Sequence, residues 1–313
     1  MLKNGIIAFA KEIDRISAEK QGLEYEIYAT WGDSFQVKVI SGEIDNYSVH
    51  DFIGISLRVK TDGKMGYAST TSYDVGGAEE LIEKAIENAR VIESPDEQFI
   101  YHGDKEYPTP KTVDSSLASV SASEKIELAK QMEKYALEYD EKIIRTMGSY
   151  VISQNSSRMI KNSSGLDVSE DFGFIAAYVI PIAKIGDDMN SGFAYTAGFN
   201  IDSLDIKSAA EESANEAIRF CGAGSCEGGS LKTIIEARAV CDLLSTFSGI
   251  FSSECTQKGL SLLVNKEGEK IASECVTITD EPTADFSFGS RGCPRTTPTP
   301  RCTPTPRRST PRR

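Results

Sequence analysis

The stretch that decides the fold is residues 24–70, EYEIYATWGDSFQVKVISGEIDNYSVHDFIGISLRVKTDGKMGYAST. Apolar and polar residues alternate through 25–29, 35–39 and 53–59, which is typical of half-buried strands. Ser41-Gly42-Glu43 and Asp62-Gly63 are turn sequences between these runs, and Asp-Gly is a strong hairpin signal. The stretch therefore predicts a meander of about four antiparallel strands.

A helix is expected on either side of this meander. Apolar residues recur at helical spacing through 2–19 and again through 81–89, and Glu93-Ser94-Pro95 ends the second run. Residues 1–95 therefore predict an α+β domain of helix, antiparallel strands and helix.

A second α+β domain is predicted for residues 121–225. Residues 96–120 are rich in Pro, Ser, Asp and Tyr without periodicity, so they are interpreted as a linker or covering loop. Ser121 and Glu124 form a capping-box pattern that opens a helix. Strand-like runs follow at 149–153, 158–161, 172–182 and 192–197, with a hairpin at 162–165. Asp202-Ser203 is expected to cap a last helix, which ends at Gly222.

Residues 226–292 predict the beginning of a third, β-rich domain. Short extended pieces are expected at 234–235, 257–264 and 271–278, with a helix over 237–251.

The composition changes at residue 292. Six of the eleven prolines lie in the low-complexity sequence 293–313, and seven arginines follow from Arg291 onward without an acidic residue. Such a segment has no core-forming residues and is expected to be disordered. It is either a basic arm that touches nucleic acid or anionic lipid, or the product of a lost reading frame, in which case the chain is truncated near Gly292. The abrupt change favours the second interpretation.

The amino-acid composition limits the classes of protein to which the chain can belong. The net charge is −13 over 313 residues, and the charge of the body is more negative still because the tail is basic. The negative charge of the main domains repels a phosphate backbone, so nucleic-acid binding is expected only through the tail. No apolar run is long enough for a membrane span and no secretory signal opens the chain, so a cytoplasmic location is expected. The seven cysteines contain no C-x-x-C pair and are expected to be reduced.

No catalytic, cofactor-binding or metal-binding residue is predicted from motifs. The two histidines, His50 and His102, have no partner at metal-ligand spacing and are expected at a strand or turn edge and in a loop. The glycine-rich run 222–229 follows a helix and lacks the lysine of a phosphate loop.

The order of several segments resembles the TldD/PmbA family. The resemblance rests on residues 32–45, 54–60, 63–70 and 85–90, and in the third domain on 243–249, 258–263, 268–273 and 277–282. It covers about residues 1–292. It implies membership of a cytosolic proteolytic assembly, in which a zinc-bearing TldD-like chain pairs with a metal-free PmbA- or TldE-like chain and cleaves peptides or unfolded proteins.

The resemblance also assigns this chain to the metal-free type. In the zinc-bearing chains a third-domain helix carries H-E-x-x-x-H. At the matching positions this chain has Ser245, Thr246 and Ile250. A serine is a poor zinc ligand, threonine is no general base at neutral pH, and isoleucine is apolar. Zinc is therefore expected only in a TldD-like partner, and this chain is expected to be inactive alone.

Two other functions remain open at this stage. An active peptidase would need Cys241, Cys255 and a carboxylate to converge on a different site. A non-enzymatic interaction protein would act on a topoisomerase, as the family's link to modulation of DNA gyrase suggests, or on nucleic acid through the tail.

Overall fold

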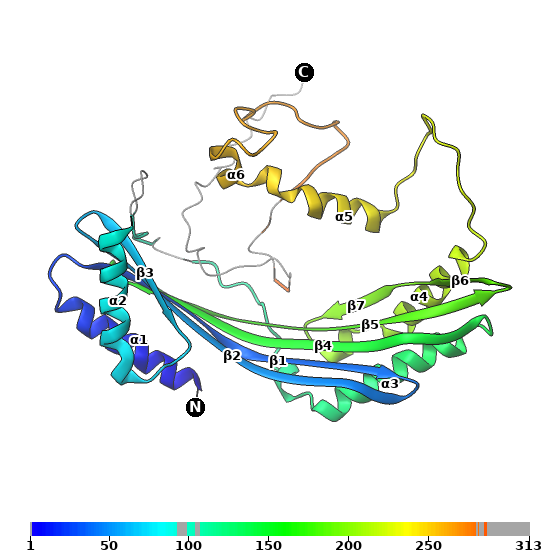
Figure 1. The fold of residues 1–313 in the computed structure, drawn as a ribbon, viewed down its shortest axis with the longest axis horizontal. Helices are drawn as coiled ribbons and strands as arrows, with labels where there is room; N and C mark the ends of the chain where they lie inside the picture. Colours follow the sequence, from blue (N-terminus) through cyan, green and yellow to red (C-terminus); the bar gives the residue numbers. More distant parts are fainter. Residues whose placement is uncertain (1, 93–98, 104–106, 280, 282–284, 287–313) are drawn as a thin grey trace, which may run out of the picture. The chain divides into compact units, whose positions relative to one another are not determined.

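A computed structural model of the chain describes residues 2–92, 99–103, 107–279, 281 and 285–286. The chain divides into two compact units (Figure 1). Among the described residues, the first comprises those up to Gly224 together with 281 and 285–286, and the second comprises 225–279. Each unit is described below by itself. Among the described residues, no helix has both the length and the apolar character that crossing a membrane requires.

The first unit is built on one antiparallel sheet of seven strands, in the order β3-β2-β1-β4-β5-β6, with β7 also paired to β5. The strands are β1 (Glu24–Ile40), β2 (Glu43–Thr61), β3 (Lys64–Thr70), β4 (Ile143–Asn162), β5 (Asp167–Ile185), β6 (Asp188–Ser191) and β7 (Ala194–Gly198). All strand pairs in this sheet are antiparallel, as expected for an α+β protein. The two domains expected at 1–95 and 121–225 share this sheet, because β1 pairs with β4.

The meander has three strands, where the sequence predicted about four. The runs 25–29 and 35–39 belong to one continuous strand, β1, and the region 43–61 is likewise one strand, β2. Gly32 does not break β1: a Cβ at this position would lie 2.1 Å from the carbonyl oxygen of Asn155 in β4. Glycine is needed there for close approach of two backbones, which a sequence pattern alone does not distinguish from a turn.

Four helices pack on this sheet: α1 (Leu2–Ala18), α2 (Ala78–Val91), α3 (Ala122–Glu138) and α4 (Ile206–Phe220). The predicted capping box of Ser121 and Glu124 is confirmed at the start of α3. The predicted cap Asp202-Ser203 is wrong. These residues lie in the 3₁₀ turn η3 (Ile201–Ser203), and Asp205 caps α4 by accepting the Ser208 N–H. Two further 3₁₀ turns are η1 (Val75–Gly77) and η2 (Leu117–Ser119).

All four helices cover the same face of the sheet. Alternate residues of β1 enter two clusters: Tyr25 to Trp31 pack with α1 and α2, and Phe35 to Val39 pack with α3 and α4. Because side chains alternate along a strand, the odd-numbered residues of β1 mark one face throughout. Figure 1 shows the long strands running from α1 and α2 at one end to α3 and α4 at the other. The opposite face carries the even-numbered residues of β1 and is here called the open face.

The first unit contains the same arrangement twice. The order helix, two long strands, short strand and helix runs from α1 to α2 and again from α3 to α4, where β7 is an additional short strand. The hairpin that closes at Thr61 and Lys64 has its counterpart at Ile185 and Asp188, a constant spacing of 124 residues. The strand order is symmetric about the β1–β4 pair, so the two halves are related by a pseudo-twofold axis between these strands.

The described residues of the segment between the halves lie against the sheet. Tyr101 and Tyr107 pack with Ile160 and Leu166 on the open face. Farther along, Gly173 of β5 donates its N–H to the carbonyl of Thr112 at 3.0 Å. The Thr112 hydroxyl donates to the carbonyl of Asp171. Residues 111–113, here called the strap, thus cover the edge of β5 where no strand pairs with it.

The second unit has helices and no strand within its described residues, 225–279. The predicted helix over 237–251 is confirmed as α5 (Ala237–Phe247) and the 3₁₀ turn η4 (Ser248–Phe251). A short helix, α6 (Ser253–Gln257), follows. The extended pieces predicted at 234–235, 257–264 and 271–278 are not strands here, since a strand needs a hydrogen-bonded neighbour. The expected disordered tail, 293–313, lies outside the described residues.

Candidate functional site

Ser245, Thr246 and Ile250 lie on one helical segment of the second unit. Ser245 and Thr246 belong to the last turn of α5, and Ile250 to η4 directly after it. The Thr246 hydroxyl donates to the carbonyl of Asp242 at 2.8 Å, which is a bond to the preceding helical turn. Two hydroxyls and an alkyl group offer neither the imidazoles nor the carboxylate that a catalytic zinc needs. These residues do not fit the zinc of the family.

No alternative metal site forms among the described residues. They contain no group of three or more His, Cys, Asp or Glu side chains that could hold a metal ion. Cys241 is exposed and Cys255 is partly buried, and both are free thiols. The converging cluster that a different peptidase site would need is thus not formed by the described cysteines.

The two histidines lie far from the third-domain helix in the sequence and serve local contacts. His50 is exposed on β2, where its Nε2 lies 2.6 Å from the Ser48 hydroxyl. His102 lies in the covering loop, and its Nδ1 is 2.8 Å from the Ser164 hydroxyl. Both positions agree with the sequence interpretation.

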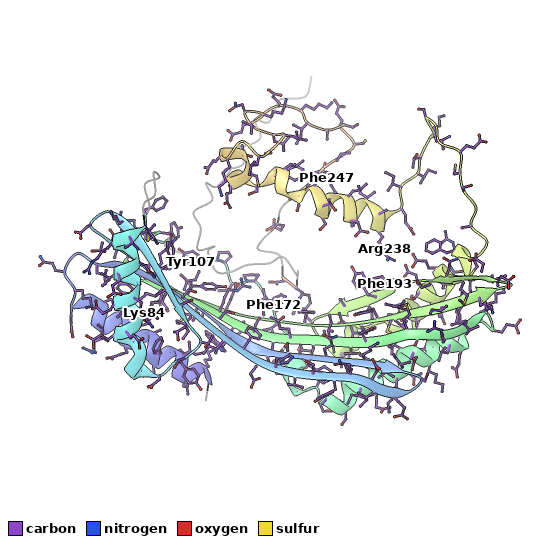
Figure 2. The ribbon with its side chains drawn as sticks, in the orientation of Figure 1. Lys84, Tyr107, Phe172, Phe193, Arg238 and Phe247 are labelled. Atoms are coloured by element: carbon purple, nitrogen blue, oxygen red, sulfur yellow. The ribbon has the colours of Figure 1, made fainter. Side chains whose placement is uncertain are left out.

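The open face of the sheet carries a row of aromatic rings that the sequence analysis did not identify. Tyr150 stacks on Tyr178 with 4.5 Å between ring centroids. Phe193 lies 5.5 Å from Tyr178 and 6.2 Å from Tyr195, whose side chain is 60% exposed. In Figure 2 the labelled Phe172 and Phe193 lie on the side of the sheet away from α3. The signal in the sequence was the even spacing of its aromatic residues. They occur at positions 172, 174 and 178 and again at 193 and 195.

Charged pairs flank this row on the open face. Lys38 binds Asp45 at 3.0 Å, and its ammonium lies 5.8 Å from the centroid of Tyr150. Burial raises the pKa of Tyr178, whereas Lys38 acts in the opposite direction. Aromatic rings beside a cation offer a surface on which flat or apolar groups can pack.

A buried ion pair lies on the same face at the other end of the sheet. Glu26 and Arg58 are 2.7 Å apart, and the Glu26 side chain is only 4% exposed. Burial raises the pKa of Glu26, although Arg58 and Asn162 lower it. The pair therefore holds two strands together without offering a free acid or base.

Three family models match the chain in the order of its segments. The PmbA/TldA metallopeptidase domain 1 matches residues 25–89, the central domain matches residues 115–220, and the C-terminal domain matches residues 228–294. Together they span most of the chain.

The chain belongs to the PmbA/TldD family.

Known relatives of this PmbA/TldD family member are longer than it. An uncharacterized protein of Methanocaldococcus jannaschii, MJ0231, is 28% identical over 280 residues, which cover 88% of this chain and 62% of the relative. The three family models confirm the family resemblance predicted from the sequence. The chain spans about six tenths of the length of this relative.

Solved structures agree with the fold. A Thermotoga maritima protein, named for a proposed role as modulator of a DNA gyrase, superposes with a TM-score of 0.76 at 25% identity. The match covers 83% of this chain and 59% of that protein. TldE from Thermococcus kodakarensis superposes with a TM-score of 0.69 at 23% identity, covering 87% of this chain and 60% of TldE. The second likeness shows the fold alone.

Proposed function

We propose that this chain is the PmbA- or TldE-like subunit of a TldD/PmbA-type metallopeptidase complex that processes peptides in the cytosol. In this proposal the chain holds no zinc, and a TldD-like partner supplies the metal. The observation that carries it is the chemistry of the α5–η4 segment. Ser245, Thr246 and Ile250 stand where zinc-bearing members have two histidines and a glutamate.

The aromatic row supports a role in holding peptide substrates. Rings at Tyr150, Tyr178, Phe193 and Tyr195 form a surface on which apolar side chains of an extended peptide can lie. Such a surface needs no reacting group of its own, so it suits a subunit that binds substrate while its partner carries out hydrolysis.

The test uses the full chain with and without a zinc-bearing TldD-like protein of the same source. We expect no stoichiometric zinc in the purified chain by elemental mass spectrometry, and no cleavage of an unfolded peptide by the chain alone. We expect chelator-sensitive cleavage when the two proteins are mixed and co-elute. The matched control is a partner whose motif glutamate is replaced by glutamine, which should bind this chain without cleaving the peptide.

Stoichiometric zinc in the isolated chain, or chelator-sensitive cleavage by it, would overturn the metal-free assignment. Failure of the two proteins to co-elute would overturn the assignment to a complex.

A further inference from the structure

The edge of β2 in the first unit is open over its first half. β3 pairs only with residues 55–61 of β2, and among the described residues no strand or loop pairs with the outer edge of 43–54. Nearly all of Glu43–Asp51 is exposed, including three large apolar side chains, Ile44, Tyr47 and Val49, which are 47%, 48% and 52% exposed. Uncovered edges of this kind are normally blunted or paired.

The hairpin register shows which backbone groups point outward. A two-residue hairpin closes on a pair that exchanges both hydrogen bonds, here Thr61 and Lys64. Every second residue of β2 from Thr61 therefore points its N–H and C=O toward β3, and the others point toward β1. Continued along the strand, this alternation leaves Tyr47, Val49, Asp51 and Ile53 facing outward.

The pseudo-twofold shows what such an edge accepts. With the spacing of 124 residues, Tyr47 and Val49 correspond to Asp171 and Gly173 of β5. These are the two residues that bond to Thr112 of the strap. A segment of the chain itself therefore covers the equivalent edge, through the carbonyl and the hydroxyl of Thr112, whereas the edge of β2 has no such segment among the described residues.

The charge along this edge of β2 indicates which kind of peptide segment would bind there. Residues 43–57 contain Glu43, Asp45 and Asp51 and no lysine or arginine, and Lys38 of β1 neutralises Asp45 at 3.0 Å. Asp51 lies directly opposite Asp33 on β1, and like charges at facing positions are unfavourable. Lys125 interacts electrostatically with Asp33, so Asp51 is the carboxylate of this pair that a basic peptide would meet. A second copy of this acidic strand would add further repulsion. The chain's own basic residues, 293–313, suit the edge poorly, since their frequent prolines have no N–H to donate.

We propose that the outward edge of β2 at 47–53 binds an extended, lysine- or arginine-bearing peptide segment as an added antiparallel or parallel strand. The inference stands on the edge itself and not on the proposed place of the chain in a protease complex.

The test is fluorescence anisotropy with the full chain and a labelled peptide of about ten residues that alternates lysine with valine or threonine. We expect saturable binding that weakens with added salt. We expect no binding of the same peptide with glutamate in place of lysine. A peptide methylated at alternate backbone nitrogens on one edge should fail to bind, and one methylated on the other edge should still bind.

The protein variants remove one outward donor at a time. Val49→Pro deletes an outward N–H and should weaken binding at least about tenfold. Val49→Thr keeps the N–H and should bind normally. Ser69→Pro deletes an outward N–H on β3, away from the proposed edge, and should also bind normally. Asp51→Asn should weaken binding and reduce its dependence on salt.

Equal binding of both methylated peptides would overturn the proposal even if Val49→Pro does not fold, because charge alone would then explain the affinity. Equal binding by a folded Val49→Pro variant would overturn it as well. A chain that elutes as a dimer, binds no peptide and becomes monomeric through Val49→Pro would show that a second copy is the occupant, against the proposal.

Discussion

At the scale of single residues, buried carboxylates stabilise the turns and strands of the first unit. Glu133 of α3 is 2% exposed and accepts the N–H groups of Ser41 and Gly42 at 3.0 and 2.8 Å. It also accepts the Thr146 hydroxyl at 2.5 Å. Both residues of that turn have positive φ, a conformation that needs external support when one of them is not glycine. One helical side chain thus fixes the β1–β2 hairpin.

Glu133→Gln should lower the free energy of unfolding by about 1–3 kcal/mol, because an amide cannot accept all three donors and leaves a buried group unpaired. The measurement is urea denaturation. Glu127→Gln, an exposed change on the same helix, serves as the control and should be near neutral. A loss no greater than that of the control would show that the turn is held by its own sequence.

Glu26 should give stability that depends on pH. Burial raises its folded pKa above the ordinary 4.5, so its contribution is complete below pH 4.5 and is lost as the pH rises through the folded pKa. The advantage of the wild type over Glu26→Gln should therefore shrink as the pH rises from 4.5 through the folded pKa. Urea unfolding of both proteins at each pH measures it, with exposed Glu79→Gln as the control. An advantage that grows with pH would mean that Arg58 dominates.

At the scale of elements, glycine permits the same helix–strand contact in each half. A Cβ on Gly66 would lie 2.0 Å from the carbonyl oxygen of Ala85 in α2. A Cβ on Gly192, after β6, would lie 2.0 Å from the carbonyl oxygen of Ser213 in α4. These contacts bring two helices unusually close to the sheet, and any larger residue must push the helix away.

Gly66→Ala and Gly192→Ala should each destabilise the protein by about 2 kcal/mol or more, since the new methyl group meets backbone that cannot rotate aside. Gly54→Ala should cost clearly less, because its Cβ would meet only Thr30 at 3.6 Å. Thermal unfolding of the three variants compares them. Similar losses of stability in all three variants would show that the close contacts are not the cause.

The same elements show what the sequence could predict. Periodicity and turn chemistry were sufficient for α1, α3 and the hairpins at Asp62-Gly63 and 162–165, because these depend on neighbouring residues. They were insufficient for the continuity of β1, since Gly32 and the Asn155 carbonyl that it approaches are far apart in the chain. The aromatic row was missed for the same reason. Its members come from β4, from β5, and from β7 with the residue before it, and only the pairing of strands brings them together.

At the scale of the whole molecule, the β1–β4 pair determines how the first unit unfolds. Fourteen residues of β1 pair with β4, from Glu26 to Val39. Each half also contributes its own helices to the core on one face. The halves therefore share their central contact, although they match separate family domains.

The first unit should unfold in one transition. The single tryptophan, Trp31, is buried in the cluster of the first half and reports on that half. Its fluorescence and the far-ultraviolet circular dichroism, which averages both halves, should therefore give coincident denaturation curves. Mutation of Val151, in the cluster of the second half, should shift both curves together. Separate midpoints would show that the halves are independent.

The two like halves belong to one polypeptide, and this explains why their equivalent sheet borders are covered differently. A dimer of separate subunits would carry one connecting segment for each copy, whereas a single polypeptide has one tether for both. Within the described part of the chain, the connecting segment covers one of the two related borders, and no strand or loop lies along the other. The unequal covering of two related borders thus follows from the fusion of both halves into one polypeptide.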